Sequence, residues 1–345
     1  MPKKAEAKKT ITEVTMPKEK AEKPNILKNK INFVGYIEVN GANPNGDPTT
    51  NEPRMEDDFG RITQVCLKRK IRNRLQDFGE RIFVQQRNRT DDGKATLLER
   101  YKESSEEVSK ILEDSKDFTF EQKKQVASIM QDKYMDVRLF GQIFPYNSKK
   151  SKKKDEDADN DEGNDNKKSG GNDGNKSVNI TGCVSISPAI SIDRIEICTD
   201  QITKSAPFES DSDTMGTYHY VPFGVYKFYG SILPEFAKKN DVTTEDCNKL
   251  KDAISTMFEN DFSNARPDGS MLLRRLYWME VLPEDSETDI KKTVISNPRY
   301  MLSRIKETRL VDEPKKWEDY QFDDAELMKL QEAGVAKIDV VKFDI

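Results

Sequence analysis

One stretch, residues 31–78, constrains the fold of this 345-residue chain more than any other. It opens with INFVGYIEVN, in which β-branched and aromatic residues recur at a period of two, as they do in a strand. Asn40-Gly41 and Asn45-Gly46-Asp47-Pro48 then supply turn chemistry, because Asn and Gly tolerate positive φ and Pro fixes φ. The stretch therefore predicts a strand, a turn-rich loop, and a helix over about 62–78.

The predicted helix has an apolar stripe and a basic flank. The apolar side chains that recur at helical spacing, and so should face a core, are Leu67, Ile71, Leu75 and Phe78. The cations that share a neighbouring face are Arg61, Lys68, Arg69 and Arg72. A basic helix face beside a loop with available backbone N–H groups can hold a polyanion. A basic flank is more often a solvated surface, so both interpretations stay open on composition alone.

The length allows one large domain or two small ones, and the composition sets two segments apart from the folded part. Hydrophobic and charged residues each make up 34% of the chain, an apolar share below that of typical globular domains. The Lys-rich residues 1–29 lack apolar periodicity, and 148–177 contain no aromatic or large aliphatic residue. Both are expected to be disordered, since neither can bury enough apolar surface to offset chain entropy. The remaining residues of 30–345 suffice for a sizeable core.

Charge and cysteine content narrow the classes of function. The net charge of −5 means that any nucleic-acid binding depends on local basic patches rather than on a basic protein. Four scattered cysteines and one histidine predict neither a zinc site nor a disulfide framework, and we expect no cofactor. No run is long enough to span a membrane and no apolar signal segment begins the chain, so we expect a cytoplasmic protein.

The rest of the chain completes a familiar order of elements. Residues 79–140 carry weak helical stripes and predict a helical insertion beside a sheet, without an independent core. The further predicted strands are 178–186, 190–198, 218–229 and 271–282, and a helix capped by Thr243 or Thr244 precedes the last of them. Without its insertions this is an α+β fold, the ferredoxin-like or RRM-like plan of an antiparallel sheet with helices on one face.

Five segments match a single family pattern in order. They are NPNGDP at 43–48, TQVCLKRKIRN at 63–73, DVRLFG at 136–141, MGTYHYVPFGVY at 215–226 and MFENDFSNAR at 257–266. Together they resemble the backbone subunit of type I CRISPR Cascade complexes, in the RAMP superfamily. The last two segments favour subtype I-C.

The resemblance implies an architecture and a role. It implies an RRM-like palm, a helical fingers insertion at 79–140 and a thumb hairpin at 199–219. It also implies a non-catalytic subunit whose copies form a helical filament along CRISPR RNA, with bases left free to pair with target DNA in antiviral defence. The implied partners are CRISPR RNA, further copies of the chain, the large and RNA-end-capping subunits of Cascade and, through the guide, target DNA.

A scaffold that serves any guide should contact phosphate and sugar rather than bases. Met215, near the expected thumb tip, is a candidate wedge between bases, although a residue in such a place is more often an ordinary loop residue. Arg266 is a second phosphate candidate, and for His219 a structural or stacking role is favoured over catalysis. The complete set of expected RNA-binding residues is Asn43, Asn45, Gly46, Arg61, Lys68, Arg69, Arg72, Arg138, Met215, His219, Ser263 and Arg266.

The alternative function is a metal- or Asp-dependent endoribonuclease of the RAMP superfamily. Metal-free RNA cleavage usually relies on histidine, and a single histidine excludes a two-histidine mechanism within one chain. Asp47 can in principle act as a base or a metal ligand, but its simpler role is to hydrogen-bond the turn at 45–48. No helix-turn-helix unit is present in the pattern, which argues against a transcriptional regulator.

Overall fold

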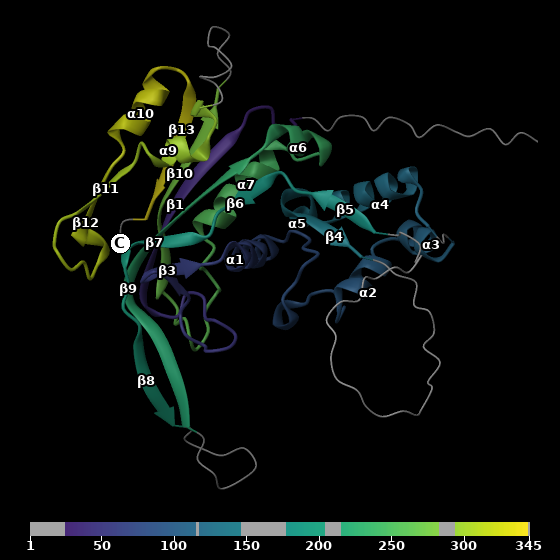
Figure 1. Ribbon diagram of the computed structural model, residues 1–345. Helices are drawn as coiled ribbons and strands as arrows, with labels where there is room; N and C mark the ends of the chain where they lie inside the picture. The colour runs from purple at the N-terminus through teal and green to yellow at the C-terminus, as the bar shows by residue number, and fades with distance from the viewer. Residues whose placement is uncertain (1–24, 115–116, 146–176, 204–214, 283–293, 344–345) are drawn as a thin grey trace, which may run out of the picture.

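A computed structural model describes residues 25–114, 117–145, 177–203, 215–282 and 294–343 (Figure 1). The strands of its main sheet are β1 (Ile31–Ala42), β2 (Met55–Glu56), β3 (Phe59–Ile62), β6 (Val184–Ile186), β7 (Ala189–Arg194), β8 (Cys198–Thr203), β9 (Met215–Ile232), β10 (Met271–Val281) and β13 (Ala336–Lys342). Their order is β13-β10-β1-β9-β7-β3-β2, with β6 and β8 also paired to β9. All of these pairings are antiparallel, as the α+β prediction requires.

The central strand β1 is buried on both of its faces. Phe33 and Ile37 point into one hydrophobic cluster, while Val34 and Tyr36 belong to a second cluster, and all four are fully buried. The predicted strand is confirmed. Alternate residues of the strand, however, face two different hydrophobic clusters, rather than a core on one side and solvent on the other.

The first face is covered by α1 (Gln64–Asp77), α6 (Pro234–Lys239) and α7 (Thr244–Ser255). In α1 the predicted stripe of Leu67, Ile71 and Leu75 is fully buried. The prediction for Phe78 is wrong: the helix ends at Asp77, and Phe78 is 41% exposed at the C-cap, where its ring contacts the Arg74 guanidinium. Thr243 caps α7, as predicted, by accepting a hydrogen bond from the Asp246 amide.

The opposite face is covered by the C-terminal part of the chain, so the expectation of helices on one face only is wrong. The elements there are α9 (Pro298–Leu302), β11 (Lys306–Arg309), the 3₁₀ turn η2 (Trp317–Asp319), β12 (Tyr320–Asp323) and α10 (Ala325–Glu332). Met301 of α9 and Leu327 of α10 are fully buried in the cluster that contains Tyr36. The physical reason is the apolar second face of β1, which would otherwise contact water.

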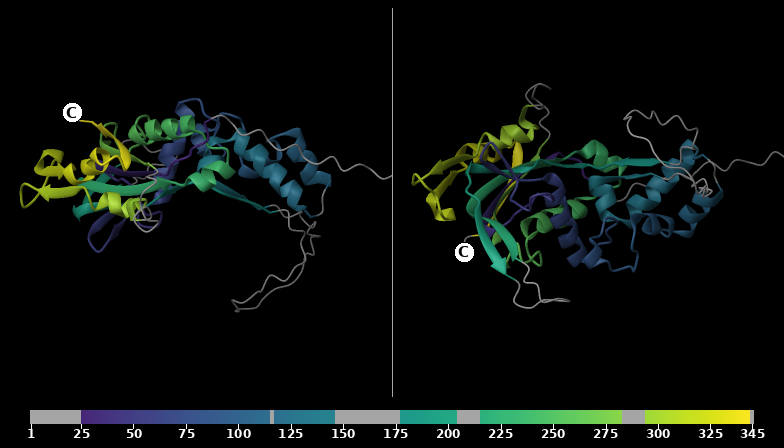
Figure 2. Two further views of the ribbon diagram at one scale, coloured as in Figure 1. Left: turned by 90° about the horizontal axis from the view of Figure 1, so that it is seen from above. Right: turned by 60° about the horizontal axis from the view of Figure 1, so that its bottom comes forward.

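Residues 79–145 form a helical lobe at one end of the molecule (Figure 2). Its elements are η1 (Arg87–Arg89), α2 (Leu97–Lys102), α3 (Glu106–Asp114), α4 (Phe120–Lys133), α5 (Met135–Phe140), β4 (Gly141–Phe144) and its partner β5 (Val178–Thr181). Contrary to expectation the lobe has its own core, in which Tyr101, Val126 and Met130 are buried. The β5 strand completes that core, which explains why 79–140 alone looked weakly apolar.

Two predicted disordered segments fall largely outside the described residues: 1–24 of the tail, and 148–176 of the charged loop. Residues 25–29, which we placed in the tail, instead pack on the folded body. Leu27 is 5% exposed and its amide donates to the Val242 carbonyl at 3.1 Å.

The strands β8 and β9 extend beyond the sheet as a hairpin (Figure 1). Its register runs from Cys198↔Tyr220 to Thr203↔Met215, and residues 204–214 between the strands lie outside the described part of the chain. No helix in the described ranges combines the length and the apolarity needed to cross a bilayer.

Candidate nucleic-acid interface

The loop after β1 is tied to the first turn of α1. The Asn45 side-chain carbonyl accepts hydrogen bonds from the Thr63 amide at 2.9 Å and the Thr63 hydroxyl at 3.0 Å. The Thr63 hydroxyl in turn accepts from the Cys66 amide at 3.2 Å, which makes it the N-cap of α1. Asn45 therefore positions the loop against the basic helix, while its carbonyl oxygen is occupied within the protein.

Thr63→Ala is expected to lower the free energy of unfolding by about 1 kcal/mol, because the helix loses its N-cap acceptor. Denaturant unfolding measures this change. Thr63→Ser keeps the hydroxyl and is the matched control. Equal losses in the two variants would show that the methyl group, rather than the cap, stabilises the loop.

Asn43 and Gly46 shape the same loop from inside. Asn43 is 6% exposed; its side-chain amide donates to the Asn51 carbonyl at 2.8 Å, and its backbone amide donates to the Ala265 carbonyl at 2.8 Å. A Cβ on Gly46 would lie 3.2 Å from the Asn43 amide nitrogen, so only glycine fits without adjustment. The bond from Asn43 to Ala265 joins the 43–47 loop to the loop between α7 and β10.

Asp47 closes the turn of this loop. Its carboxylate accepts from the Thr49 amide at 2.9 Å and forms an ion pair with Arg54 at 2.8 Å. The Thr49 hydrogen bond, followed by the Arg54 charge, holds the pKa of Asp47 below its usual value. Asp47 is therefore a structural acceptor, but its side-chain partners Thr49 and Arg54 lie just after the 45–48 turn to which the simpler interpretation assigned it.

The basic flank of α1 contains three cations with different surroundings. The Arg72 guanidinium donates to the fully buried Asp136 carboxylate at 2.9 Å, and Arg69 donates to the Val84 carbonyl at 2.6 Å. Lys68 lies 5.3 Å from the centre of the Phe140 ring and has no ion pair within the described ranges. Burial, and then the charge of Arg72, lowers the pKa of Lys68. An anion beside Lys68 would relieve that repulsion.

Two of the predicted contacts lie apart from this flank. Arg61, on β3, pairs with Glu56 at 2.9 Å. Arg138, on α5, donates to Asp246 of α7 at 2.6 Å with only 14% of its side chain exposed, so it fastens the helical lobe to the sheet layer. The structure does not bring either side chain together with Lys68.

The loop between α7 and β10 carries a second cationic group. Arg266 and Ser263 exchange backbone hydrogen bonds of 2.8 and 2.9 Å, which fold the loop back on itself. The Arg266 guanidinium lies 3.5 Å from the Asp261 carboxylate, which also binds the buried Lys70 of α1. Lys70 was not among the predicted residues, although its place in the LKRK run put it in the same basic segment.

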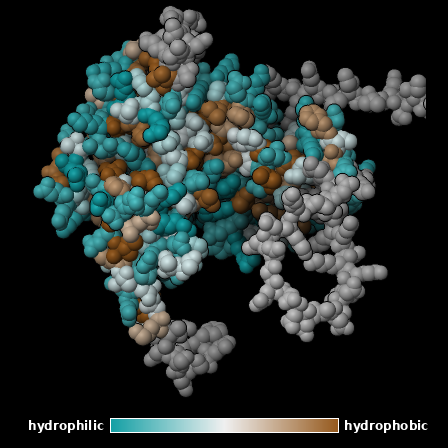
Figure 3. Space-filling model, in the orientation of Figure 1, coloured by the Kyte–Doolittle hydropathy of each residue, from teal (hydrophilic) through white to brown (hydrophobic). Residues whose placement is uncertain are grey.

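The hairpin residues lie beside the loop but extend away from it. Tyr218 at the hairpin base donates from its hydroxyl to the Gly41 carbonyl at 3.3 Å. His219 shares a 2.9 Å hydrogen bond between its Nδ1 and the Thr199 hydroxyl. Met215 and Ile202, at the far end, are 65% and 55% exposed, and apolar atoms are visible there in Figure 3.

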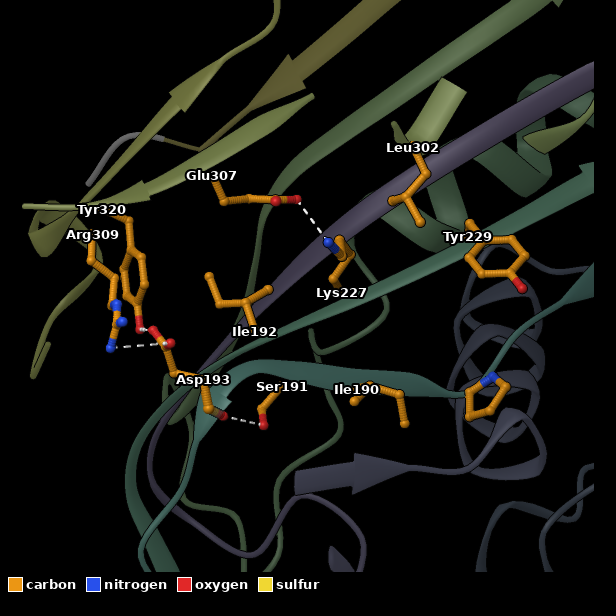
Figure 4. A pocket seen from close by; sticks show the side chains of 11 residues that line it. Ile190, Ser191, Ile192, Asp193, Lys227, Tyr229, Leu302, Glu307, Arg309 and Tyr320 are labelled. Carbon is orange, nitrogen blue, oxygen red and sulfur yellow. Dashed lines mark hydrogen bonds and ion pairs between the residues drawn. The ribbon is translucent and has the colours of Figure 1, made fainter. Parts of the chain in front are cut away.

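A cleft of about 420 Å³ lies on the other face of the sheet, between β7, β9 and the β11–β12 pair (Figure 4). Its charged groups satisfy one another: Lys227 pairs with Glu307 at 2.9 Å, and Asp193 accepts from the Tyr320 hydroxyl at 2.7 Å and pairs with Arg309 at 3.6 Å. Because the cleft offers no unpaired charge, the stronger candidate for an anionic partner is the surface made by 43–47, the start of α1 and 261–266.

Comparisons with known proteins agree with one family. The family model described as CRISPR-associated protein Cas7 matches residues 29–324. The CRISPR-associated protein Cas7 of Haloferax volcanii is 25% identical over 238 residues, which are 64% of this chain and 62% of that protein. The chain thus spans less than two thirds of the length of the curated relative that it matches.

Two solved structures show a distant similarity. A chain of a CRISPR RNA-guided surveillance complex in a pre-nicking state has 11% identity and a TM-score of 0.40, covering 79% of this chain and 88% of its own. A chain of a second CRISPR RNA-guided surveillance complex has 12% identity and a TM-score of 0.36, covering 80% and 83%. Since the family model spans most of the sequence, the chain belongs to the CRISPR-associated protein Cas7 family.

Proposed function

We propose that this protein is a non-catalytic backbone subunit of a type I CRISPR effector complex, of subtype I-C, that binds CRISPR RNA through its sugar-phosphate backbone. The observation that carries the proposal is the basic flank of α1, where Lys68 is half-buried without a carboxylate partner in the described part of the chain. RNA phosphates supply the missing negative charge without reading sequence. The family match supports the same role.

The proposal assigns a task to each part of the fold. Strands β1, β7, β9 and β10 with α1 and α7 form the RRM-like palm. The lobe of α2–α5 forms the fingers, and the β8–β9 hairpin is the described part of the thumb. Exposed Met215 at the end of the hairpin is then the wedge between bases, since apolar side chains unstack nucleic acid in this way. Copies stack along the RNA, in the cytoplasm, together with the large and RNA-end-capping subunits of Cascade.

The nuclease alternative is disfavoured by Asp47. A general base works best when its pKa lies near the working pH, whereas the hydrogen bond from Thr49 and the charge of Arg54 hold the pKa of Asp47 below its usual value. The Asp47 carboxylate already binds the Thr49 amide and the Arg54 guanidinium, so it is not free to accept a proton from RNA.

Single-stranded RNAs of unrelated sequence are the test. Fluorescence anisotropy should give similar affinities that fall steeply as salt rises, and mass photometry should show oligomers that lengthen with the RNA. The RNA should stay intact with Mg²⁺ present. Strong sequence preference would contradict the scaffold role, and specific cleavage lost in Asp47→Ala would establish the nuclease instead.

A further inference from the structure

Phe262 is a large apolar side chain that the fold leaves in solvent. It is 72% exposed and makes no ring contact with any residue of the described ranges. The hollow beside it holds only about 10 Å³, too little for a ligand to enter. A ligand for Phe262 therefore lies against the exposed surface of the ring rather than in a cavity.

The loop anchors the backbone on both sides of Phe262. On one side of Phe262 the Asp261 carboxylate binds the buried Lys70 ammonium. On the other side Ser263 exchanges two backbone hydrogen bonds with Arg266. Because the backbone on both sides of Phe262 is already anchored, stacking on the ring has to order only the side chain.

One cation near Phe262 remains accessible to an anionic partner. Lys70 and Arg266 share the carboxylate of Asp261, and Asp268 lines the same hollow. Lys70 is buried, whereas the Arg266 side chain is 27% exposed, so Arg266 is the group that can reach a phosphate. The Ala265 carbonyl also accepts the Asn43 amide, which places this loop directly against the 43–47 loop. Phe262 therefore belongs to the candidate interface, although it is not among the RNA-binding residues expected from the sequence.

We propose that Phe262 is a stacking platform for one nucleobase of single-stranded RNA, with Arg266 contacting the adjacent phosphate. The inference rests on the proposed function and adds a base-contacting residue to a surface otherwise assigned to the sugar-phosphate backbone. A stacked ring accepts any base, because every base has a π-face, so the contact keeps the binding independent of sequence.

The experiment uses RNAs carrying 2-aminopurine at successive positions, whose fluorescence falls on stacking. Wild type should quench it at recurring positions, and Phe262→Ala should abolish that quenching and weaken binding roughly 5- to 100-fold at every salt concentration. Arg266→Gln, by contrast, should reduce the salt slope by about one. Phe262→Trp should retain the quenching, and Phe262→Leu, which keeps apolar bulk without a ring, should lose it.

Phe120 is the matched control, since it is 75% exposed but begins α4 in the helical lobe. Phe120→Ala should bind as wild type does. Unchanged affinity and quenching in Phe262→Ala, or wild-type behaviour of Phe262→Leu, would overturn the stacking role while leaving the RNA-binding function in place. Failure of the wild type to bind any RNA would instead remove the proposed function itself.

Discussion

Asp136→Ala is expected to destabilise the RNA-free protein by about 3–5 kcal/mol. The Asp136 carboxylate is fully buried and accepts hydrogen bonds from the Phe83 amide at 2.7 Å, the Val84 amide at 3.1 Å and the Arg72 guanidinium at 2.9 Å. Removing it leaves a largely buried cation and two backbone donors without their acceptor. Denaturant unfolding of the purified protein measures the loss.

A double-mutant cycle with Arg72→Ala assigns the loss to the pair. The double variant should be less destabilised than the sum of the two single variants, because no unpaired charge remains in it. Additive losses would show that the backbone hydrogen bonds of Asp136 carry the effect and that the ion pair contributes little. The cycle also measures how much stability Arg72 variants lose. An RNA-binding defect in those variants can then be separated from a loss of folded protein.

Replacing Lys68, Arg69 and Arg266 together by glutamine is expected to weaken binding of single-stranded RNA by about a thousandfold. The figure follows if each charged contact contributes about 1.5 kcal/mol. The slope of log affinity against log salt should become shallower by about two, because each phosphate contact to a single strand contributes about 0.7 to the slope and three contacts are lost. Anisotropy titrations at several salt concentrations, with RNAs of unrelated sequence, measure both quantities.

A second triple variant controls for net charge. Lys110→Gln, Lys306→Gln and Lys337→Gln remove the same charge from exposed positions on α3, β11 and β13. This control should change affinity only a few-fold and leave the slope nearly unchanged. If the first triple variant altered the preference among RNA sequences, the account of sugar-phosphate contacts would be wrong.

The local elements of the fold were predictable because their signals are local. The stripe of α1 and the strand β1 both follow from the spacing of apolar residues within a few turns or pleats. The burial of Val34 and Tyr36 was not predictable, because their cover comes from the short elements of 294–342, whose apolar residues show no long periodicity. Burial on a second face depends on a contact between distant segments, which a local pattern does not encode.

The candidate interface shows the same division. The cations of the basic flank were visible in the sequence, but their partners were not. Asp136 lies 64 residues from Arg72, and Asp246 lies 108 residues from Arg138. Only the fold distinguishes these structural pairs from Lys68, which has no counter-charge in the described ranges. The solvent exposure of a side chain is likewise not encoded in a local pattern, so the sequence alone does not identify Phe262 as an exposed ring.

The strand β9 runs without interruption from the sheet centre into the hairpin. Its 18 residues span about 60 Å, and β1 pairs with it from Ala42↔Val221 to Ile31↔Ile232. One end of β9 is therefore fixed in the core of the sheet, while its other end carries the hairpin. If, as proposed, copies of this chain dock through the hairpin, substitutions in the core that displace β9 should also displace the hairpin and so alter the spacing between neighbouring copies.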